Sequence, residues 1–280
     1  MSFTPHVFET AAPPVSRAGY WRKTIGEWLA MLGGLLYWGI FGLGLTLVSI
    51  VLLLILPPVV GRRIGQRLIH LLFRVFVCYL KITNLVRVDL SDLKSLRKKS
   101  EPFIVAPNHT SLWDAVFIFA CLPHAVCVMK ESILKNPVLG GGARLAGYIP
   151  NDSIKKMIRA ATAALAEGSQ LLLFPEGTRT DADQRWINPL KGGCGIIATR
   201  TGCPVQVLFI RSDTRFLQKG WPLWKRPAFP LQLSFEVGPE LRPHSGESPQ
   251  DFTRRLQAVY EQELSRPHPL RRQLVTGHEA

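Results

Sequence analysis

The sequence predicts an α/β domain, with a mostly parallel or mixed sheet flanked by helices, behind an N-terminal membrane-embedded helical segment. From residue 83 onward, short apolar runs of strand length alternate with helical patterns, which is typical of α/β architecture. Before that point, residues 28–60 contain no Asp, Glu, Lys, Arg or His, and so long an uncharged run indicates a membrane-embedded segment. We therefore divide the chain into a membrane-anchoring segment, residues 1–82, and an α/β domain, residues 83–280.

The uncharged run is long for one upright membrane span. Pro57-Pro58 is expected to end its helix, which leaves Trp28 to Leu56, about 43 Å long, against a hydrocarbon core of about 30 Å. Either a tilted single span or a shallow hairpin that turns among the glycines of residues 33–44 fits this length. Glu9 upstream and the length itself argue against a cleavable signal peptide. A buried helix of a soluble domain is the third alternative.

Basic residues follow the uncharged run. Residues 62–82 interleave apolar side chains with Arg, His and Lys, the pattern of a basic amphipathic helix at a membrane surface, although an ordinary packing helix has it too. The whole chain has 34 Lys and Arg against 20 Asp and Glu, a net charge of +14 that predicts an anionic partner such as a membrane surface. No zinc-finger spacing, RNA-recognition signature or long basic arm is present, so we expect no nucleic-acid partner.

The α/β domain contains six candidate strands, and helices are expected between them. Ser153 is a suitable N-cap for a helix that ends near Glu167, and Ser248 is one for a last helix that reaches about Leu264. The five cysteines are odd in number and lack metal-ligand spacing, so we expect reduced thiols in a cytoplasm-facing domain. The candidate strands are residues 103–106, 125–129, 148–150, 171–174, 205–210 and 231–237.

The segment Asn108-His109-Thr110-Ser111-Leu112-Trp113-Asp114 follows the first of these strands, where open α/β sheets place active sites. On a continuous helix His109 and Asp114 would lie about 140° apart. If Ser111 is instead the N-cap and Asp114 completes a capping box, Asp114 can turn back towards His109. A carboxylate on one ring nitrogen leaves the other free to take a proton from a hydroxyl. The alternative is that Asp114 only caps the helix.

The segment Phe174-Pro175-Glu176-Gly177-Thr178-Arg179 follows the fourth candidate strand. The chain is expected to turn sharply there and to present Thr178 and Arg179 at the edge of the sheet. A guanidinium offers planar, paired donors that suit a phosphate or a carboxylate. The alternative is a surface salt bridge between Glu176 and a nearby cation.

These segments resemble the lysophospholipid acyltransferase family, whose type activity is 1-acylglycerol-3-phosphate acyltransferase. The resemblance covers roughly residues 80–240 and implies a glycerolphosphate acyltransferase-like fold for the domain. The family's first motif, a His and an Asp separated by four residues, matches His109 and Asp114, and its third, FPEGTR, matches residues 174–179 at every position. Residues 130–140 resemble the second block, a Lys-led segment that runs into a Pro and a Gly, and residues 203–210 resemble the Pro-containing fourth.

The resemblance implies a role for each motif. His109 is then the general base, Asp114 its orienting partner, and Lys130 a second cation for the acceptor's head group. The acceptor-binding loop comprises Glu176, Gly177, Thr178 and Arg179. Neither a metal nor a cofactor is implied, because acyl-CoA or acyl-carrier protein serves as co-substrate.

The implied reaction has no covalent enzyme intermediate. His109 deprotonates the free hydroxyl of 1-acylglycerol-3-phosphate, which attacks the thioester to give phosphatidic acid. Backbone N–H groups near residues 110–112 or 177–178 are candidate donors to the oxyanion. The lipid partners place the protein in a membrane, the inner (cytoplasmic) membrane in a bacterium, with the catalytic domain on the cytoplasmic side.

Three departures from the family pattern bear on the acceptor. Asn151-Asp152 stands where many members have an acidic residue followed by Arg, Gln206 replaces an apolar residue or Pro, and the glycines of residues 140–142 are expected to widen a turn. An acyltransferase for another lyso-lipid, such as a lyso-amino-acid lipid, or for a non-glycerol hydroxylated acceptor is therefore the alternative. A non-catalytic membrane-binding protein is disfavoured, because the motifs are intact.

Other groups have weaker claims to chemistry. Cys194 stands among glycines and is either a nucleophile at a helix start or a small packing residue, the latter being favoured. Ser111 lacks the Gly-x-Ser-x-Gly frame of serine hydrolases. A loop with Trp221 and Trp224, together with Lys219, Lys225 and Arg226, either rests on lipid head groups or is a plain surface loop.

Overall fold

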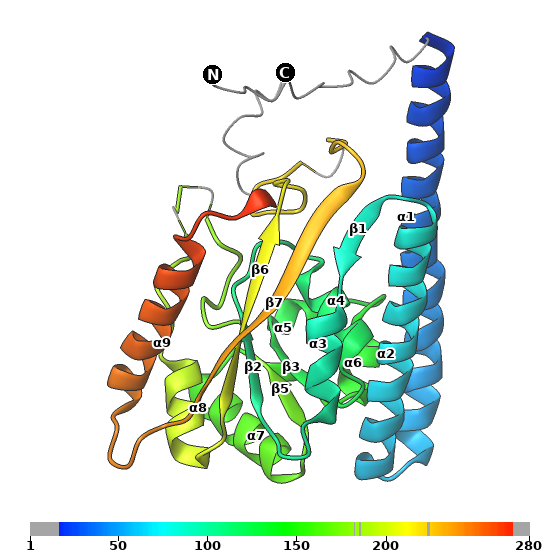
Figure 1. The fold of residues 1–280 in the computed structure, drawn as a ribbon. Coiled ribbons are helices and arrows are strands. Elements are labelled where there is room, and N and C mark those ends of the chain that lie inside the picture. The colour runs from blue at the N-terminus through cyan, green and yellow to red at the C-terminus, as the bar shows by residue number, and fades with distance from the viewer. Residues whose placement is uncertain (1–16, 182, 185, 223–224, 271–280) are drawn as a thin grey trace, which may run out of the picture.

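A seven-stranded sheet forms the middle of the molecule in the computed structural model, which describes residues 17–270 apart from 182, 185, 223 and 224 (Figure 1). The strand order is β1-β7-β6-β2-β5-β3-β4. The strands are β1 (Val86–Asp89), β2 (Ile104–Pro107), β3 (Ala125–Met129), β4 (Ile149–Pro150), β5 (Gln170–Leu172), β6 (Val205–Ser212) and β7 (Leu231–Leu241). The helices are α1 (Arg17–Ile55), α2 (Pro58–Ile82), α3 (Ser91–Ser95), the 3-10 helix η1 (Leu96–Lys98), α4 (Asp114–Cys121), α5 (Glu131–Leu134), α6 (Gly140–Leu145), α7 (Ile154–Ala166), α8 (Gly193–Thr201) and α9 (Pro249–Leu264).

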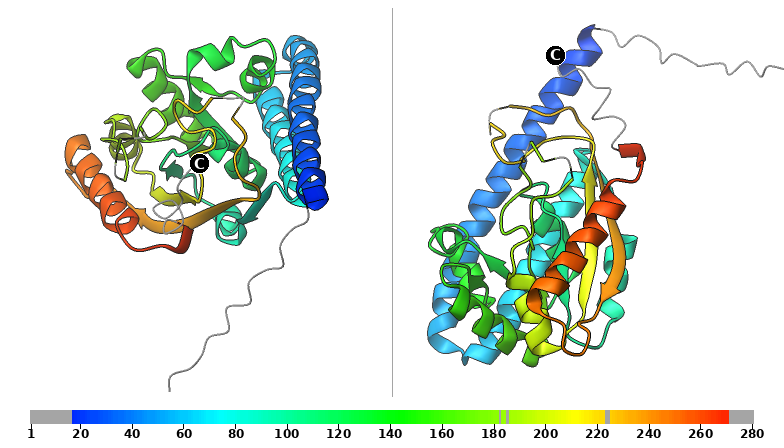
Figure 2. Two further views of the ribbon diagram at one scale, coloured as in Figure 1. Left: turned by 90° about the horizontal axis from the view of Figure 1, so that it is seen from above. Right: turned by 90° about the vertical axis from the view of Figure 1, so that its left-hand side faces the viewer.

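The sheet is mixed, which confirms the predicted fold class. Strands β6, β2, β5, β3 and β4 are parallel to one another, β7 is antiparallel to β6, and β1 is parallel to β7. Helices α8 and α9 pack together on one side of the sheet, and α1 and α2 pack with α4 and α6 on the other (Figures 1 and 2). Because β2, β5 and β3 are parallel neighbours, the segments that follow them meet at one edge of the sheet.

All six predicted strands are present, with β3 at the predicted bounds and the others shifted at their ends. Strand β1 was not expected, because its four residues alternate apolar and charged side chains too briefly to stand out. The two predicted helix starts are confirmed: the Ser153 hydroxyl accepts from the Lys156 N–H at 3.4 Å, and the Ser248 hydroxyl accepts from the Asp251 N–H at 3.1 Å.

The N-terminal segment forms two antiparallel helices, and of the two alternatives for its apolar run the shallow hairpin among the glycines of residues 33–44 is wrong. Helix α1 is continuous from Arg17 to Ile55, and the chain turns back into α2 at Pro57, as the Pro57-Pro58 pair predicts. The glycines allow close packing instead of a turn. A Cβ on Gly42 would stand 3.1 Å from the carbonyl oxygen of Val138, and the Thr46 hydroxyl donates to that same oxygen at 2.9 Å. Helix α1 is thereby docked on the domain.

The three glycines of residues 140–142 belong to the first turn of α6 and do not widen a loop. A Cβ on Gly141 would stand 2.6 Å from the Cα of Thr46, and Gly142 lies against Leu45. On α2, Gly65 meets the backbone of Ala146 in the same way. The missing side chains therefore let α6 approach α1 and α2 at backbone distance, which explains this departure from the family pattern.

Helix α2 has two different faces. Phe76, Val77 and Leu80 are buried against the domain, so α2 is a packing helix on this side. The opposite face exposes basic residues, among them Arg63 and Arg67. The packing alternative is confirmed for the buried face, while the membrane-surface alternative stays a prediction for the basic face.

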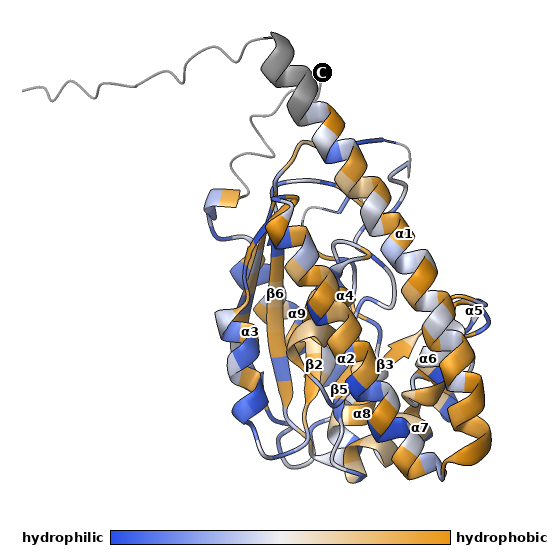
Figure 3. Cartoon of the chain, turned by 90° about the vertical axis from the view of Figure 1, so that its right-hand side faces the viewer, coloured by the Kyte–Doolittle hydropathy of each residue, from blue (hydrophilic) through white to orange (hydrophobic). Residues whose placement is uncertain are grey.

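The apolar surface of α1 is largely exposed. Within the described residues, Thr24–Ile55 is the one helical stretch long and apolar enough to cross a membrane, and only 17% of its most apolar window is buried. Figure 3 shows hydrophobic residues along the visible side of α1. A long, contiguous apolar surface that stays exposed is typical of a membrane or partner surface.

We predict that Gly42→Leu destabilises the protein whereas Gly44→Leu does not. A Cβ on Gly44 meets nothing within 4 Å, while one on Gly42 collides with Val138. Overpacking of this kind costs about 1–3 kcal/mol, against a gain in helix propensity of about 1 kcal/mol that both variants share. Thermal unfolding in detergent measures the difference. Equal midpoints for the two variants would show that α1 does not dock on residue 138.

Candidate active site

Asn108 fixes the start of the first motif to the sheet. Its side-chain amide donates to the carbonyl oxygen of Ile210 at 2.9 Å, and its side-chain oxygen accepts from the Ile210 N–H at 2.7 Å. These two bonds continue the ladder between β2 and β6 by one more position. His109 therefore begins its loop from a rigid point at the carboxyl end of β2.

His109 and Asp114 form the predicted pair. The His109 Nδ1 lies 2.9 Å from Asp114 Oδ2, and the Asp114 side chain is only 1% exposed against 17% for His109. A carboxylate accepts and does not donate, so Nδ1 carries the proton and Nε2 presents its lone pair. Nε2 makes no hydrogen bond to the described residues. The imidazole thus has the tautomer that a general base requires.

The predicted capping box is present in part. The Ser111 N–H donates to Asp114 Oδ2 at 2.8 Å, which is the expected backward bond, and the Thr110 hydroxyl donates to Oδ1 at 3.3 Å. The Ser111 hydroxyl, however, accepts from the Trp113 N–H at 3.3 Å, and α4 begins only at Asp114. Asp114 therefore caps its segment and contacts His109 at the same time, so it does more than cap the helix.

The second motif folds directly against His109. The Phe174 ring stacks on the imidazole, with 3.8 Å between ring centroids and 24° between planes. The Thr180 N–H donates to the His109 carbonyl oxygen at 2.6 Å. Gly177 has φ of +66°, a conformation that glycine adopts without strain, and it closes the turn by donating to the Phe174 carbonyl at 3.0 Å. The two motifs form one site.

Glu176 lies inside this site and not at its surface. Its side chain is 1% exposed and accepts from the His109 N–H at 2.7 Å, from the Asn188 N–H at 2.9 Å and from the Thr180 hydroxyl at 2.9 Å. Burial raises the pKa of Glu176, and these hydrogen bonds oppose that rise. The surface salt bridge considered for Glu176 is therefore wrong. The carboxylate joins the two motifs from within.

Asn188 and Thr180 hold the second motif in shape, and neither was expected. The Asn188 side chain donates to the Arg179 carbonyl at 3.1 Å and accepts from the Asp181 N–H at 3.2 Å. An Asn-Pro pair marks a turn in the sequence. Nothing in the sequence indicates which backbone groups that turn contacts.

Arg179 is anchored through one of its nitrogens. Nη1 donates to the carbonyl oxygens of Leu217 at 2.7 Å and of Gln218 at 3.0 Å. Burial lowers the pKa of Arg179, an effect that the Asp114 carboxylate opposes. Nε and Nη2 make no hydrogen bond to the described residues. Two of the five donors of the guanidinium thus fix its position, and three remain for a ligand.

Lys130 and Thr178 are the other predicted ligands of the acceptor. Lys130 directly follows β3 and is exposed, so the parallel pairing of β3 with β5 places it at the same edge as the second motif. Thr178 is half-buried, and neither its hydroxyl nor its N–H is bonded within the described residues.

Most of the candidate oxyanion donors are already occupied. The Ser111 N–H is bonded to Asp114, the Leu112 N–H donates to the Leu217 carbonyl at 3.3 Å, and the Gly177 N–H closes its own turn. Of the amides considered, those of Thr110 and Thr178 make no hydrogen bond in the described part of the chain.

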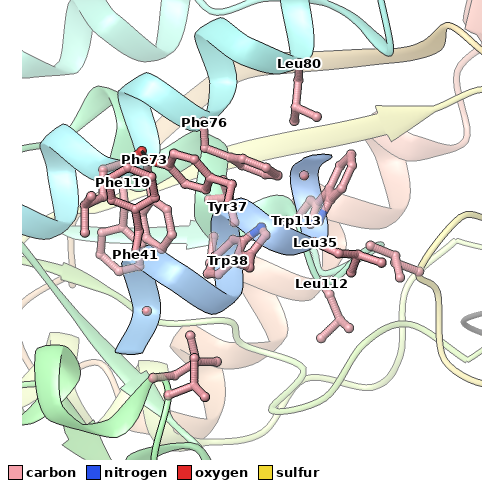
Figure 4. A pocket seen from close by; sticks show the side chains of 18 of the residues that line it. Leu35, Tyr37, Trp38, Phe41, Phe73, Phe76, Leu80, Leu112, Trp113 and Phe119 are labelled. Atoms are coloured by element: carbon pink, nitrogen blue, oxygen red, sulfur yellow. Dashed lines mark hydrogen bonds between the residues drawn. The ribbon is translucent and has the colours of Figure 1, made fainter. Parts of the chain in front are cut away.

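An apolar cavity of about 590 Å³ adjoins the first motif. Side chains of α1 and α2 line it together with Phe119 of α4, whose ring stacks on that of Phe73 with 5.9 Å between ring centroids (Figure 4). Leu112 and Trp113, which stand between His109 and Asp114 in the sequence, also line it. The cavity has the size of a ligand pocket, commonly about 300–1,000 Å³. Sequence periodicity gave no sign of it, because its walls come from five separate parts of the chain, residues 30–45, 69–85, 112–119, 129–148 and 216–229.

The remaining candidates do not join the site. Cys194 is buried, and burial raises its pKa to about 12, so its thiol is a packing group and not a nucleophile. In the loop at residues 219–226, Lys219 pairs with Asp181 and Arg226 pairs with Glu27 of α1. These ion pairs connect the loop to the segment after the second motif and to α1, but they add no residue to the site. Trp224 lies outside the described residues.

Only one of the three departures from the family pattern lies at the site's edge of the sheet. Gln206 stands at the opposite end of β6, where it accepts from Lys99 at 2.7 Å and donates to the Gly238 carbonyl at 2.7 Å. The glycines of α6 serve helix packing. Asn151-Asp152 follows β4, and the Asn151 N–H donates to the Met129 carbonyl at 3.0 Å, next to Lys130.

Comparison with known proteins agrees with this geometry. Residues 87–211 match the acyltransferase family model. A 1-acyl-sn-glycerol-3-phosphate acyltransferase of Pseudomonas aeruginosa is 22% identical over 68% of this chain and 73% of its own length. One of Helicobacter pylori is 26% identical over 49% of this chain and 58% of its own length.

A solved structure has the same fold. The crystal structure of the 1-acyl-sn-glycerophosphate acyltransferase of Thermotoga maritima superposes with a TM-score of 0.61 at 20% identity, covering 87% of this chain and 96% of that one. This likeness shows the fold, and the match of residues 87–211 to the acyltransferase family model confirms the predicted resemblance.

We predict that Asp114→Asn lowers kcat for acyl transfer by about 10²- to 10⁴-fold with little change in the acceptor's KM, because the amide no longer fixes the imidazole tautomer. Steady-state kinetics on the purified variant measures both constants. Thr110→Val is the matched control, since it removes one hydrogen bond to the same carboxylate and leaves the His109 contact in place. A full kcat in Asp114→Asn would show that the pair has no catalytic role.

Proposed function

We propose that this protein, through its acyltransferase-family domain, is a membrane-associated O-acyltransferase that moves a fatty acyl group from acyl-CoA or acyl-carrier protein to the free hydroxyl of 1-acylglycerol-3-phosphate. The product is phosphatidic acid. The observation that supports this most strongly is the His109–Asp114 pair: a buried carboxylate holds Nδ1 at 2.9 Å and leaves Nε2 unoccupied beside the second motif. His109 is then the general base.

In the proposed reaction, His109 Nε2 takes the proton of the acceptor hydroxyl while the hydroxyl oxygen attacks the thioester carbonyl. The carbon–sulfur bond then breaks, the thiol leaves with a proton returned by the imidazolium, and an ester remains on the acceptor. The negative carboxylate of Asp114 stabilises the imidazolium between these steps. A base placed in this way contributes about 10²- to 10⁴-fold to the rate.

Stabilisation of the oxyanion is assigned to the N–H groups of Thr110 and Thr178. Thr110 follows His109 in the first motif, and Thr178 belongs to the second motif. Neither N–H makes a hydrogen bond within the described residues. Loss of one such donor typically costs about 10²- to 10³-fold in kcat. Ser111, Leu112 and Gly177 are not candidates, because their amides are bonded elsewhere.

The acceptor's phosphate is assigned to Arg179 and Lys130. Arg179 is held by Nη1 and keeps Nε and Nη2 for the paired contact that a guanidinium makes with phosphate. Lys130 supplies a point charge from the neighbouring strand. Glu176 is buried and Gly177 has no side chain, so both residues shape this loop and neither binds the phosphate through a side chain.

The acyl chains are assigned to the apolar cavity. A hydrocarbon chain gains free energy by leaving water for such walls, and the cavity is lined by Leu112 and Trp113, which stand between His109 and Asp114 in the sequence. The exposed apolar surface of α1 would bring the protein to the bilayer that holds both the acceptor and the product.

A second acceptor class is supported by one specific observation. Asn151-Asp152 provides no cation after β4, at the edge where the acceptor's head group is placed. A lyso-amino-acid lipid or another hydroxylated acceptor requires the same base and fewer phosphate contacts. The catalytic dyad is the same for both acceptor classes.

The test of the proposed function uses the purified protein in detergent. It is supplied with acyl-CoA or acyl-carrier protein and with a panel of lyso-acceptors, and the products are identified by mass spectrometry. We expect phosphatidic acid from 1-acylglycerol-3-phosphate as the principal product. Acylation of a lyso-amino-acid lipid alone would contradict the proposed acceptor, and no product from any acceptor would contradict the enzymatic activity itself.

We predict that His109→Ala abolishes transfer to every acceptor, because no other group replaces Nε2, while association with lipid vesicles is unchanged. The matched control is His244→Ala, which removes an exposed imidazole outside the site. Product formation and vesicle flotation are measured on both variants. Turnover by His109→Ala at the wild-type rate would remove the general-base assignment.

A further inference from the structure

We propose that Lys191 is a further substrate-binding residue, whose ammonium group binds the phosphate of the acceptor together with Arg179 and Lys130. This inference rests on the proposed function and specifies how its head group is recognised. It assigns a role to a side chain that belongs to neither motif and follows the second motif by twelve residues.

The first step is the position of the Lys191 backbone. Its N–H donates to the Pro175 carbonyl oxygen at 2.8 Å, which ties the residue to the start of the second motif. The neighbouring Asn188 is bonded to Glu176, Arg179 and Asp181. The segment that carries Lys191 is therefore held rigidly against the acceptor loop.

The second step is the course of the side chain. A Cβ placed on Gly177 would stand 2.7 Å from Lys191 Cδ and 2.9 Å from Nζ. The lysine thus crosses the open face of the one residue in the motif that has no side chain, and its ammonium lies beside that turn. Gly177 is required twice, for its positive φ and for the room it leaves to Lys191.

The third step is the state of the charge. Lys191 is exposed, and its ammonium has neither an ion pair nor a hydrogen bond within the described residues. Lys219 on the nearby loop is different, because it is paired with Asp181. Nη1 of Arg179 is already bonded, because it donates to the carbonyl oxygens of Leu217 and Gln218. Lys191 is therefore a cation held beside the turn without a protein partner among the described residues.

The fourth step is the geometry of the acceptor. In 1-acylglycerol-3-phosphate, the reacting hydroxyl and the phosphate are on adjacent carbons, so a hydroxyl at His109 Nε2 places the phosphate within a few bonds of the base. The second motif borders His109, since Glu176 accepts from its N–H and Phe174 stacks on its ring. A phosphate there lies close to the Gly177 turn. Lys191 supplies a cation beside the second motif, whereas Asn151-Asp152 supplies none after β4.

A phosphate could also belong to the acyl donor, because coenzyme A and the carrier-protein arm both contain phosphate groups. The experiment therefore measures a separate KM for the acceptor and for the donor. Lys191→Met keeps an unbranched side chain over Gly177 and removes the charge, and Lys191→Arg restores a cation. Lys98→Met, which changes an exposed lysine of η1 away from the site, is the matched control.

With 1-acylglycerol-3-phosphate as the acceptor, we expect Lys191→Met to raise the acceptor's KM by about 10- to 100-fold, the usual effect of losing a charged hydrogen bond. The donor's KM, measured with acyl-CoA, should be unchanged. Lys191→Arg should recover most of the loss, and Lys98→Met should match the wild type. An unchanged KM for the acceptor, or a rise confined to acyl-CoA, would overturn the assignment.

Folding and the proposed function are controlled separately. Thermal unfolding of each variant shows whether the charge or the fold was changed, and Lys191→Gln is a second neutral variant if Lys191→Met does not fold. Turnover of the acceptor 1-acylglycerol-3-phosphate by the wild type is established first. If the wild type fails to use this acceptor, the proposed function is wrong; if it succeeds and Lys191→Met is unaffected, only the role of Lys191 is wrong.

Discussion

His109 is held between two buried carboxylates, and the rest of the site depends on this arrangement. Asp114 binds the ring through Nδ1, while Glu176 accepts from the backbone N–H of the same residue at 2.7 Å. Each carboxylate is 1% exposed, and burying a charge is costly unless hydrogen bonds satisfy it. Glu176 meets that condition through Asn188 and Thr180. The same bonds that offset its burial also place the second motif against His109.

The sheet brings the two motifs to the same edge, and the two carboxylates then fix their positions relative to His109. Because β2, β5 and β3 are parallel neighbours, three segments separated in the sequence leave the sheet at one edge. Helices α1 and α2 close the apolar cavity on the adjoining side, and the glycines of α1 and α6 allow that approach. In the proposed reaction, the acceptor hydroxyl meets the imidazole, its phosphate meets the cations of the second motif and Lys130, and the acyl chains meet the apolar cavity.

The sequence predicted those features that depend only on residues close together in the chain. The spacing of His109 and Asp114, the strand before Phe174 and the serine caps of α7 and α9 were all evident from neighbouring residues. The direction of Glu176 was not, because it depends on Asn188 and on the pairing of β2 with β5. The shallow hairpin, one of the two alternatives for residues 28–56, was wrong for the same reason. Glycines mark both turns and close contacts, and only the partner segment at residues 138–142 distinguishes them.

The central claim is that Asp114 holds His109 as the tautomer with a free Nε2. The ¹⁵N NMR spectrum of histidine-labelled protein tests this directly, with His109→Ala used to assign the two ring signals. We predict that neutral His109 carries its proton on Nδ1, with an unprotonated Nε2, and that Asp114→Asn shifts this balance. A His109 ring protonated at Nε2 and bare at Nδ1 would contradict the account, because the nitrogen that must accept the substrate's proton would already carry one.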